Sequence, residues 1–374
     1  MVNILGEHIA PLMPRLATLP PHVKVHLYGK SGAPVPRRKM GHLLVRSDVP
    51  DDTVAWVEDM LGMSKGRLAA VNCQPSTVNR HLLSTKHEEG SMQFTKMHGL
   101  GNDFIVVDMF GGECIADPKA LAQAICHRHF GVGADGLVLV HPSQNADCRM
   151  QIINSDGSEA ESCGNALRCV ARFMQLKGRV EGTLVRIEAP AGIYDAEIES
   201  LASGEQLIKV NMGAPLLAPA AIPALVAGDG PVVDLALSTP HGDFRGVLVN
   251  SGVPHVVVFV PDLAAIDFVS AGQAIEKHPL FPQGINADFV EVHSRAYLKV
   301  KVWERGAGAT LACGTGAAAV AVAAHLTGRS DRRLTVALPG GELCMEWAEE
   351  SGHVFMTGPA VVAFTGQWSM GRIA

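Results

Sequence analysis

Two segments of the sequence place a cysteine in front of a glycine and a polar residue. Residues 154–168 read Asn-Ser-Asp-Gly-Ser-Glu-Ala-Glu-Ser-Cys-Gly-Asn-Ala-Leu-Arg, and residues 304–316 read Glu-Arg-Gly-Ala-Gly-Ala-Thr-Leu-Ala-Cys-Gly-Thr-Gly. In each, a polar residue stands nine positions before the cysteine, and an alanine-rich apolar stretch follows it. Cys163 and Cys313 lie 150 residues apart. We interpret the segments as copies of one unit.

The spacing predicts that each cysteine stands at the start of a helix. A helix N-terminus carries partial positive charge and unpaired N–H groups, which favour a thiolate and can bind a carboxylate. Two thiols on opposite faces of one carbon can remove its proton and return another from the other side. The developing carbanion then needs fixed donors in a dry cavity. The alternative interpretation is that both cysteines only pack against their neighbours. The occurrence of two copies in the same register argues against it.

The 150-residue offset indicates duplication of a whole domain, because it is too long for a solenoid repeat. Apolar stretches at 150–153 and 298–303 precede the two turns, and similar breakers at 176–179 and 326–329 follow the two helical patterns. Short β-like runs alternate with helical patterns from Met92 onward, which predicts an α/β (α+β) fold.

Composition excludes several classes of partner. The 374-residue chain is 47% hydrophobic and 18% charged, with a net charge of −6, so it lacks the basic field of a nucleic-acid-binding protein. It contains no apolar run of membrane-spanning length and no signal-peptide pattern, so we expect a cytoplasmic protein that binds neither nucleic acid nor membrane. We expect no cofactor and no metal, since no lysine context suggests pyridoxal phosphate and no ligand spacing suggests a metal site.

The remaining cysteines do not form a disulfide framework, and we expect reduced thiols. Cys126, Cys169 and Cys344 lie among apolar residues and are expected to be small buried hydrophobes.

Residues 92–374 resemble diaminopimelate epimerase, a cofactor-independent enzyme with two catalytic cysteines. The motif Asn-x-Asp-Gly-Ser-x4-Cys-Gly-Asn-x2-Arg is highly specific to that family. Five further blocks carry the resemblance: residues 92–104, 131–136, 250–255, 284–289 and 303–308. The resemblance implies reversible conversion of LL- to meso-2,6-diaminopimelate, in lysine and peptidoglycan biosynthesis.

The resemblance also implies an architecture. Two pseudo-symmetric halves each wrap a sheet around a central helix. The first half would comprise residues 92–212 plus 358–374, with the C-terminal strand returning to it, and the second half residues 213–357. A homodimer is also implied.

The family's site residues map onto this sequence one by one. Cys163 and Cys313 match the catalytic acid/base pair, while His255 and Glu304 match groups that tune the thiol pKa values. The positions that match substrate-binding residues are Asn102, Asn154, Gly164, Asn165, Asn286, Glu304, Arg305, Gly314 and Thr315. Asn102 could instead be a turn residue, and His255 a structural histidine.

Three positions depart from the family pattern. Gly136 and Val253 stand where some members have a glutamine and an asparagine that touch substrate, which leaves the distal end of the substrate less defined. Phe364 stands where some members have a tyrosine at the dimer contact.

The N-terminal residues 1–62 resemble the C-terminal end of the ATP-grasp enzyme N5-carboxyaminoimidazole ribonucleotide synthetase, through residues 2–6, 26–30 and 37–42. The ATP-binding body is missing from this chain, so we expect no ligase activity. We expect a small β-rich appendage joined by a linker, residues 63–91. Weak binding of a phosphorylated ligand by the basic residues 30–42 is the less favoured alternative.

Two other functions remain open. One is a related two-cysteine racemase acting on proline or hydroxyproline, which Glu304 and Arg305 oppose because they suit a second charged end of the substrate. The other is an inactive binding homologue, which the presence of both cysteines opposes.

Overall fold

The computed structural model describes residues 91–369 except 113 and 202, and three strands before them. These three are β1 (Val2–Leu5), β2 (Val23–Leu27) and β3 (Lys39–Val45). They form an antiparallel sheet in the order β1-β3-β2, a β-rich unit as expected. Residue contacts divide the chain into Met1–Lys86 and His87–Ala374. The predicted linker before Ser91 and the side chains of the predicted basic segment lie outside the described residues.

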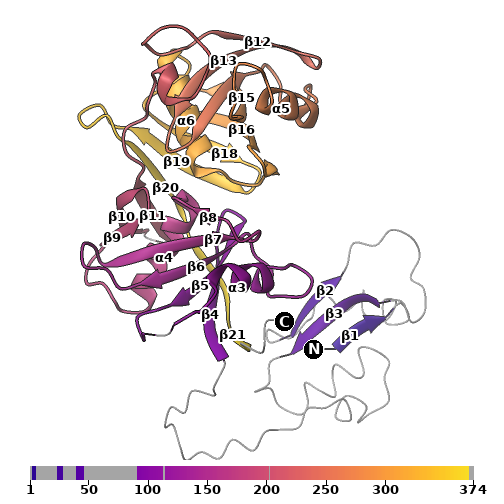
Figure 1. Ribbon diagram of the computed structural model, residues 1–374, viewed down its shortest axis with the longest axis vertical. Coiled ribbons are helices and arrows are strands. Elements are labelled where there is room, and N and C mark those ends of the chain that lie inside the picture. The colour runs from indigo at the N-terminus through magenta and orange to yellow at the C-terminus, as the bar shows by residue number, and fades with distance from the viewer. Residues whose placement is uncertain are drawn as a thin grey trace, which may run out of the picture. The chain divides into compact units, whose positions relative to one another are not determined.

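The first lobe of the larger unit opens with two strands and closes with three. Its elements are β4 (Ser91–Gly99), β5 (Asn102–Asp108), α3 (Pro118–Ile125), β6 (Gly136–His141), β7 (Cys148–Asn154), β8 (Glu159–Ala160), α4 (Gly164–Leu176), β9 (Leu184–Ala189), β10 (Gly192–Ser200) and β11 (Gln206–Asn211). Figure 1 shows these elements in purple and magenta.

The second lobe follows a short 3-10 turn, η2 (Pro219–Ala221), and repeats this order with one additional strand at its start. Its elements are β12 (Leu235–Thr239), β13 (Gly242–Asn250), β14 (Pro254–Phe259), α5 (Phe268–Glu276), β15 (Asn286–Ser294), β16 (Tyr297–Glu304), β17 (Gly308–Thr310), α6 (Gly314–Leu326), β18 (Arg333–Leu338), β19 (Gly341–Trp347) and β20 (Val354–Pro359). The last strand, β21 (Val361–Ser369), leaves this lobe.

The repeat inferred from the sequence extends through both lobes. Helices α4 and α6 each contain 13 residues and begin 150 positions apart. The parallel pairs β5–β6 and β7–β9 of the first lobe recur as β14–β15 and β16–β18 in the second. The predicted fold class, two pseudo-symmetric α/β halves, is therefore confirmed.

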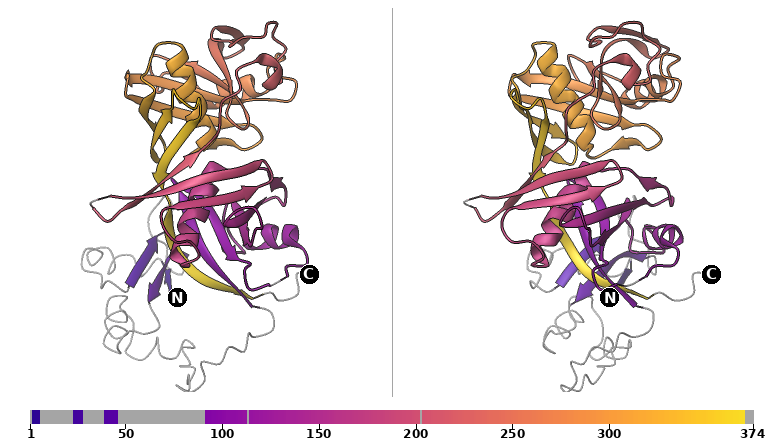
Figure 2. Two further views of the ribbon diagram at one scale, coloured as in Figure 1. Left: turned by 90° about the vertical axis from the view of Figure 1, so that its left-hand side faces the viewer. Right: turned by 60° about the vertical axis from the view of Figure 1, so that its left-hand side comes forward.

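Each lobe wraps its strands around one helix (Figures 1 and 2). Helix α6 is built largely of alanine and valine, and ten of its residues from Gly314 to Ala324 are buried. A helix that is apolar on all sides must be covered on all sides, and small side chains let the surrounding sheet approach closely. Helix α4 is covered similarly and adds larger side chains such as Phe173 and Met174.

Two strand pairings join the lobes. Strand β20 pairs with β19 of its own lobe and with β11 of the first lobe. The chain then returns as β21, which pairs antiparallel with β4 from Val361–His98 to Ser369–Ser91. In Figure 1 the yellow strand runs down beside β4. In the second lobe, β12 pairs with β13 in the same way. The boundaries of the halves at 212 and 357 stay predictions.

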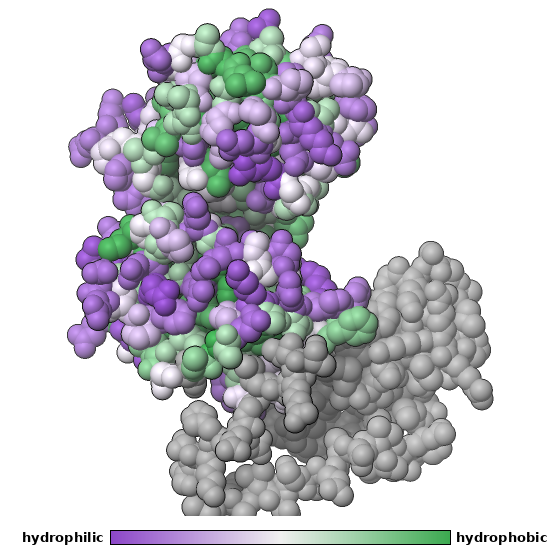
Figure 3. Space-filling view, viewed as in Figure 1, coloured by the Kyte–Doolittle hydropathy of each residue, from purple (hydrophilic) through white to green (hydrophobic). Residues whose placement is uncertain are grey.

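Hydrophilic residues cover most of the visible surface of both lobes, with hydrophobic residues in smaller groups (Figure 3). Among the described residues, no helix has the length and apolar character needed to cross a membrane.

The turn between β4 and β5 contacts the second lobe. Leu100 and Gly101 both have positive φ, 56° and 89°, and Leu100 is buried. A leucine with positive φ is strained, so tertiary contacts must hold it in place. The turn between β18 and β19 supplies one: a Cβ on Gly340 would lie 2.0 Å from the Leu100 carbonyl oxygen.

We expect the substitution Gly340→Ala to destabilise the fold by about 1–3 kcal/mol, because the clash is with backbone and cannot be relieved by a rotamer change. Gly230→Ala is the matched control, since its Cβ would meet nothing within 4 Å. Thermal unfolding of both variants measures the difference. Equal midpoints for the two variants would contradict the contact.

Three cysteines lie in the core. Burial raises the pKa of Cys126, Cys148 and Cys169 to about 12, and all three are fully buried. Cys126 and Cys169 are thus buried as expected, whereas Cys344 is only half-buried because alternate residues of β19 lie at the surface.

These thiols should make stability fall at alkaline pH. Above pH 9 the unfolded chain releases their protons while the folded chain keeps them until about pH 12, so unfolding is favoured by about 1.4 kcal/mol per pH unit for each thiol. Urea unfolding at pH 9 and pH 10 should therefore show a steeper loss in the native chain than in the triple variant Cys126→Ala, Cys148→Ala, Cys169→Ala. The same pH dependence in both proteins would refute this.

Candidate functional site

Cys163 is the N-cap residue of α4, as the sequence predicts. It is partly exposed, and its Sγ donates to Asn102 Oδ1 at 3.8 Å. Burial raises the pKa of the Cys163 thiol, although backbone N–H groups of Ala166 and Asn165 act to lower it. The helix donors thus act in the direction expected from the sequence, but desolvation opposes the thiolate more strongly.

Cys313 is the N-cap residue of α6 and begins a chain of hydrogen bonds. Gly316 N donates to its Sγ at 3.3 Å, and Thr315 Oγ1 lies 3.3 Å from the same sulfur. Thr315 Oγ1 is 3.1 Å from His255 Nε2, and His255 Nδ1 is 2.8 Å from Asp288 Oδ2. His255 and Asp288 are both fully buried. The chain connects Cys313 to a buried carboxylate through one hydroxyl and one imidazole.

The surroundings of Cys313 oppose ionisation more strongly than those of Cys163. Burial, and then the charges of Glu304 and Asp288, raise the pKa of Cys313 well above its ordinary value. The second oxygen of Asp288 is buried without a hydrogen-bond partner among the described residues, so its charge stays poorly compensated. The donors from Thr315 and Gly316 offset only part of this effect.

Glu304 lies at the end of β16 and affects both thiols. Thr310 Oγ1 donates to Glu304 Oε1 at 2.5 Å. Burial raises the pKa of Glu304, and its negative charge raises the pKa of both Cys163 and Cys313. Glu304 is therefore a carboxylate shared between the two sulfur sites.

The two helix starts meet at one methionine. A Cβ on Gly164 would lie 2.7 Å from Met356 Cε, and a Cβ on Gly314 would lie 3.0 Å from Met356 Sδ. The absence of a Cβ at both positions leaves room for the Met356 side chain in its observed place. Asn165 completes the contact, because its Nδ2 donates to the Ala312 carbonyl at 3.1 Å. The two cysteine turns thus lie against one another.

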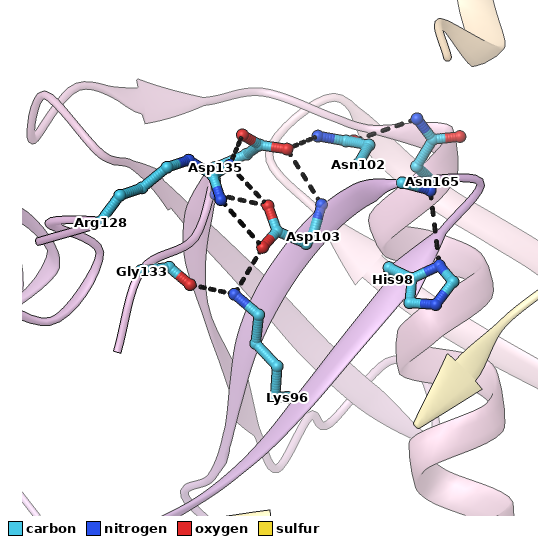
Figure 4. Close-up of polar contacts among 9 residues, drawn as sticks. Lys96, His98, Asn102, Asp103, Arg128, Gly133, Asp135 and Asn165 are labelled. Atoms are coloured by element: carbon cyan, nitrogen blue, oxygen red, sulfur yellow. Dashed lines mark hydrogen bonds and ion pairs between the residues drawn. The ribbon is translucent and has the colours of Figure 1, made fainter. Parts of the chain in front are cut away.

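Asn102 and Asn165 belong to this junction. Asn165 Nδ2 donates to Asn102 Oδ1 at 3.0 Å, and Asn102 Nδ2 donates to Asp135 Oδ2 at 2.7 Å (Figure 4). Arg168 Nη2 donates to Asn165 Oδ1 at 2.9 Å. Both predicted asparagines therefore lie beside Cys163.

The other predicted binding residues lie nearer the ends of the strands. Asn154 Nδ2 donates to Ser158 Oγ at 2.9 Å. The Asn286 amide donates to Pro254 O and accepts from Arg305 N, both at 2.8 Å, so it already binds two backbone groups. Arg305 is exposed, and among the described residues its side chain donates only to the Gln283 carbonyl oxygen, which leaves most of its donors accessible.

Sequence reasoning missed three charged groups and one hydroxyl. Asp288 lies between Ala287 and Phe289 in the buried part of β15, and a carboxylate between apolar residues of a strand is a usable signal. Asp135 and Arg168 stood inside recognised motifs without an assigned role. Thr315 was expected to bind substrate, and the structure adds contacts of its hydroxyl with Cys313 and His255.

Two further features lie apart from the cysteines. A surface pocket of about 410 Å³ lies between α5 and the turn joining β12 and β13, lined by residues such as His241, Ser270 and Lys277. Within the part of the chain that the structure describes, no group of three or more His, Cys, Asp or Glu residues is arranged to hold a metal ion.

Comparison of the N-terminal part finds a second family. Residues 1–54 match the phosphoribosylaminoimidazole carboxylase C-terminal domain, which agrees with the resemblance inferred from the sequence.

Solved structures share the fold of the larger unit. A hydroxyproline epimerase from Agrobacterium vitis has a TM-score of 0.58 at 18% identity, covering 76% of this chain and 94% of that one. A PhzF-family phenazine biosynthesis protein from Bacillus anthracis has a TM-score of 0.55 at 19% identity, covering 74% and 99%. At these identities the likeness establishes the fold alone.

Sequence comparisons assign the family. Residues 94–217 and 247–363 match the family described as diaminopimelate epimerase. The diaminopimelate epimerase of Desulfitobacterium hafniense is 49% identical over 279 residues, which are 74% of this chain and 97% of that protein. That of Desulforudis audaxviator is 50% identical over 277 residues, 74% and 99% respectively. With its paired cysteine turns, this chain belongs to the diaminopimelate epimerase family.

Proposed function

We propose that this protein interconverts LL- and meso-2,6-diaminopimelate by a two-base mechanism that uses Cys163 and Cys313. The observation that carries the proposal is the junction of the two helix starts: each begins at a cysteine, and Asn165 and Met356 connect them. Relatives that are about half identical to this chain and bear the name of this epimerase support the substrate.

The helix starts suit a substrate carboxylate. The first backbone N–H groups of α4 and α6, at Gly164, Asn165, Gly314 and Thr315, lack partners within their own helices. A carboxylate placed there accepts hydrogen bonds from these N–H groups. The same groups stabilise the negative charge that develops when the adjacent carbon loses its proton. Loss of this carboxylate from the substrate should therefore slow chemistry as well as binding.

The proton transfer needs one thiolate and one thiol. The thiolate takes the proton from the substrate carbon, and the opposite thiol donates its own proton to the other face, so the two cysteines exchange states in each turnover. Because the pKa values of both thiols are raised, one proton must first leave the pair. The chain Thr315–His255–Asp288 offers Cys313 a route for that proton.

The second charged end of the substrate fits the outer part of the site. We assign its ammonium group to Glu304 and its carboxylate to Arg305, with Asn154 and Asn286 beside them. Arg305 is exposed and Glu304 is partly buried, so an anion and a cation are available side by side. Proline and hydroxyproline have no second charged end, which disfavours the racemase alternative.

We further propose a cytoplasmic homodimer. Val361, Val362 and Phe364 on β21 are exposed, and Phe364 packs edge-on against Phe94 of β4 with ring centroids 6.0 Å apart. An exposed apolar strand beside an aromatic pair suits contact with a second copy.

Substitution of either catalytic cysteine tests the mechanism. We expect Cys163→Ala and Cys313→Ala each to abolish epimerisation of diaminopimelate without unfolding the protein, because one face of the carbon loses its acid/base group. Cys114→Ala is the control, since Cys114 is exposed and has no part in the proposed mechanism. Proton exchange at the α-carbon in deuterated water, tested separately with diaminopimelate and proline, distinguishes the epimerase from the racemase and from an inactive homologue.

Near-native turnover in either cysteine variant would exclude the two-base mechanism. Exchange of the α-proton of proline but not of diaminopimelate would support the racemase alternative. Exchange with neither substrate would support an inactive homologue.

Deletion of residues 1–91 tests the role of the N-terminal part. The residues proposed for catalysis all follow Met92, so we expect the truncated protein to keep kcat and KM within about twofold. The measurement is steady-state epimerisation by both forms at equal concentration of folded protein. A large loss of turnover in a folded truncated protein would show that the N-terminal part contributes to catalysis.

A further inference from the structure

Two neighbouring side-chain amides are held at both ends by groups of fixed polarity. Asp135 accepts from Asn102, and Arg168 donates to Asn165, while Asn165 donates to Asn102 between them. A carboxylate can only accept and a guanidinium can only donate, whereas an amide can do either. Both charged ends therefore specify the same direction for the two amides. Figure 4 shows the Asp135 end.

We propose that Asp135 and Arg168 are positioning residues that fix the direction of these amides, so that the oxygen of Asn102 faces Cys163 and the nitrogen of Asn165 faces the carbonyl before Cys313. We name the chain Asp135–Asn102–Asn165–Arg168 the amide relay. This inference rests on the proposed function, because epimerisation requires both cysteine turns to hold one geometry.

A reversed amide would break several bonds at once. If Asn102 turned over, its oxygen would face the carboxylate of Asp135 and its NH2 group would face the NH2 group of Asn165. Asn165 is 2% exposed, so water cannot replace the lost bonds. Its nitrogen must also reach Ala312 O, which only accepts. The observed direction is thus the one that leaves no group of the relay unpaired.

The Asp135 end is held by a network of charges. Arg128 Nη2 binds Asp135 Oδ1 at 2.6 Å and Asp103 Oδ1 at 2.8 Å, and Asp103 N donates to Asp135 Oδ2 at 3.0 Å. Lys96 binds Asp103 and the Gly133 carbonyl. Although burial opposes it, hydrogen bonds from Arg128 and Lys96 hold the pKa of Asp103 below its usual value. Its bonds to Arg128 and to Asp103 N therefore hold Asp135 in one position, with Oδ2 facing Asn102.

The Arg168 end is more unusual. Arg168 is fully buried, and no carboxylate pairs with it among the described residues. Besides Asn165, its guanidinium donates to Pro359 O at 3.2 Å and Met356 Sδ at 3.1 Å. Burial lowers the pKa of Arg168. A buried cation without an anion is a poor stabiliser of a fold, and its contacts with the junction indicate that orientation is its role.

If the amide relay is correct, either charged end is sufficient to fix the direction of both amides. With one end removed, the other still dictates the direction of both amides. With both ends removed, only the Ala312 carbonyl opposes reversal. We therefore expect Asp135→Asn and Arg168→Met to reduce kcat synergistically when combined. Asp135→Asn keeps the size of the side chain but removes its fixed polarity, and Arg168→Met removes the donors.

A double-mutant cycle in steady-state epimerisation tests this expectation. Asp135→Asn alone should lower kcat by about two- to tenfold, the equivalent of one net hydrogen bond. The double variant should lose more than the product of the two single losses, with KM changed less than kcat. A loss equal to or smaller than that product would overturn the relay.

A second readout does not depend on turnover. The rate at which iodoacetamide alkylates Cys163 in the ligand-free protein is measured by peptide mass spectrometry. Asp135→Asn should raise this rate several-fold more in the Arg168→Met background than in the native background, because only there can Asn102 turn its NH2 group toward the sulfur. Equal effects in both backgrounds would overturn the relay even if the protein proved not to be an epimerase.

Matched controls separate orientation from general destabilisation. Arg172→Met lies on the same helix and removes contacts to Gln175 and Gln206, and Asp108→Asn removes a partner of Arg179. This control pair should leave Cys163 alkylation unchanged and show no synergy. All variants are compared at equal folded fraction by thermal unfolding. If Arg168→Met does not fold, Arg168→Lys replaces it, because an ammonium cannot reach all three acceptors at once.

Discussion

The structure depends on the close approach of two helix N-termini. Met356 lies between Gly164 and Gly314, and Asn165 reaches across to the carbonyl before Cys313. A glycine after each cysteine allows this approach, because a Cβ at either position would press against the end of the Met356 side chain. The approach also places both sulfurs in surroundings where desolvation raises their pKa values despite the helix donors. Steric fit and acid/base state thus have one origin.

The duplicated frame carries unlike polar groups. By strand register, the positions equivalent to His255 and Asp288 are Phe104 and Val138, and the position equivalent to Arg168 is Ala318. These three counterparts are buried apolar residues. The first lobe therefore offers Cys163 a buried cation and amides, whereas the second offers Cys313 a hydroxyl, an imidazole and two carboxylates. Symmetric backbones position the sulfurs, and asymmetric side chains make them chemically different.

The sequence predicted local features better than long-range ones. The cysteine turns, the helix starts and the duplication followed from spacing, because they depend on residues close together in the chain. The burial of Arg168 and the hydrogen bond from Asn102 to Asp135 could not be predicted in this way. The contacts of Arg168 and Asn102 join segments that lie 191 and 33 residues apart in the chain. The raised pKa values of the thiols were missed for the same reason: desolvation is the sum of contacts from both lobes.

The proposed function also accounts for a carboxylate placed between two reactive thiols. In the ligand-free site, the charge of Glu304 raises the pKa of both cysteines and so disfavours a thiolate at either one. The ammonium group of a bound diaminopimelate would neutralise the charge of Glu304 and remove its effect on the thiol pKa values. The substrate carboxylate would accept hydrogen bonds from the N–H groups of the helix starts. Substrate binding would then lower the cost of forming the thiolate, so the reactive pair arises only when its substrate is present.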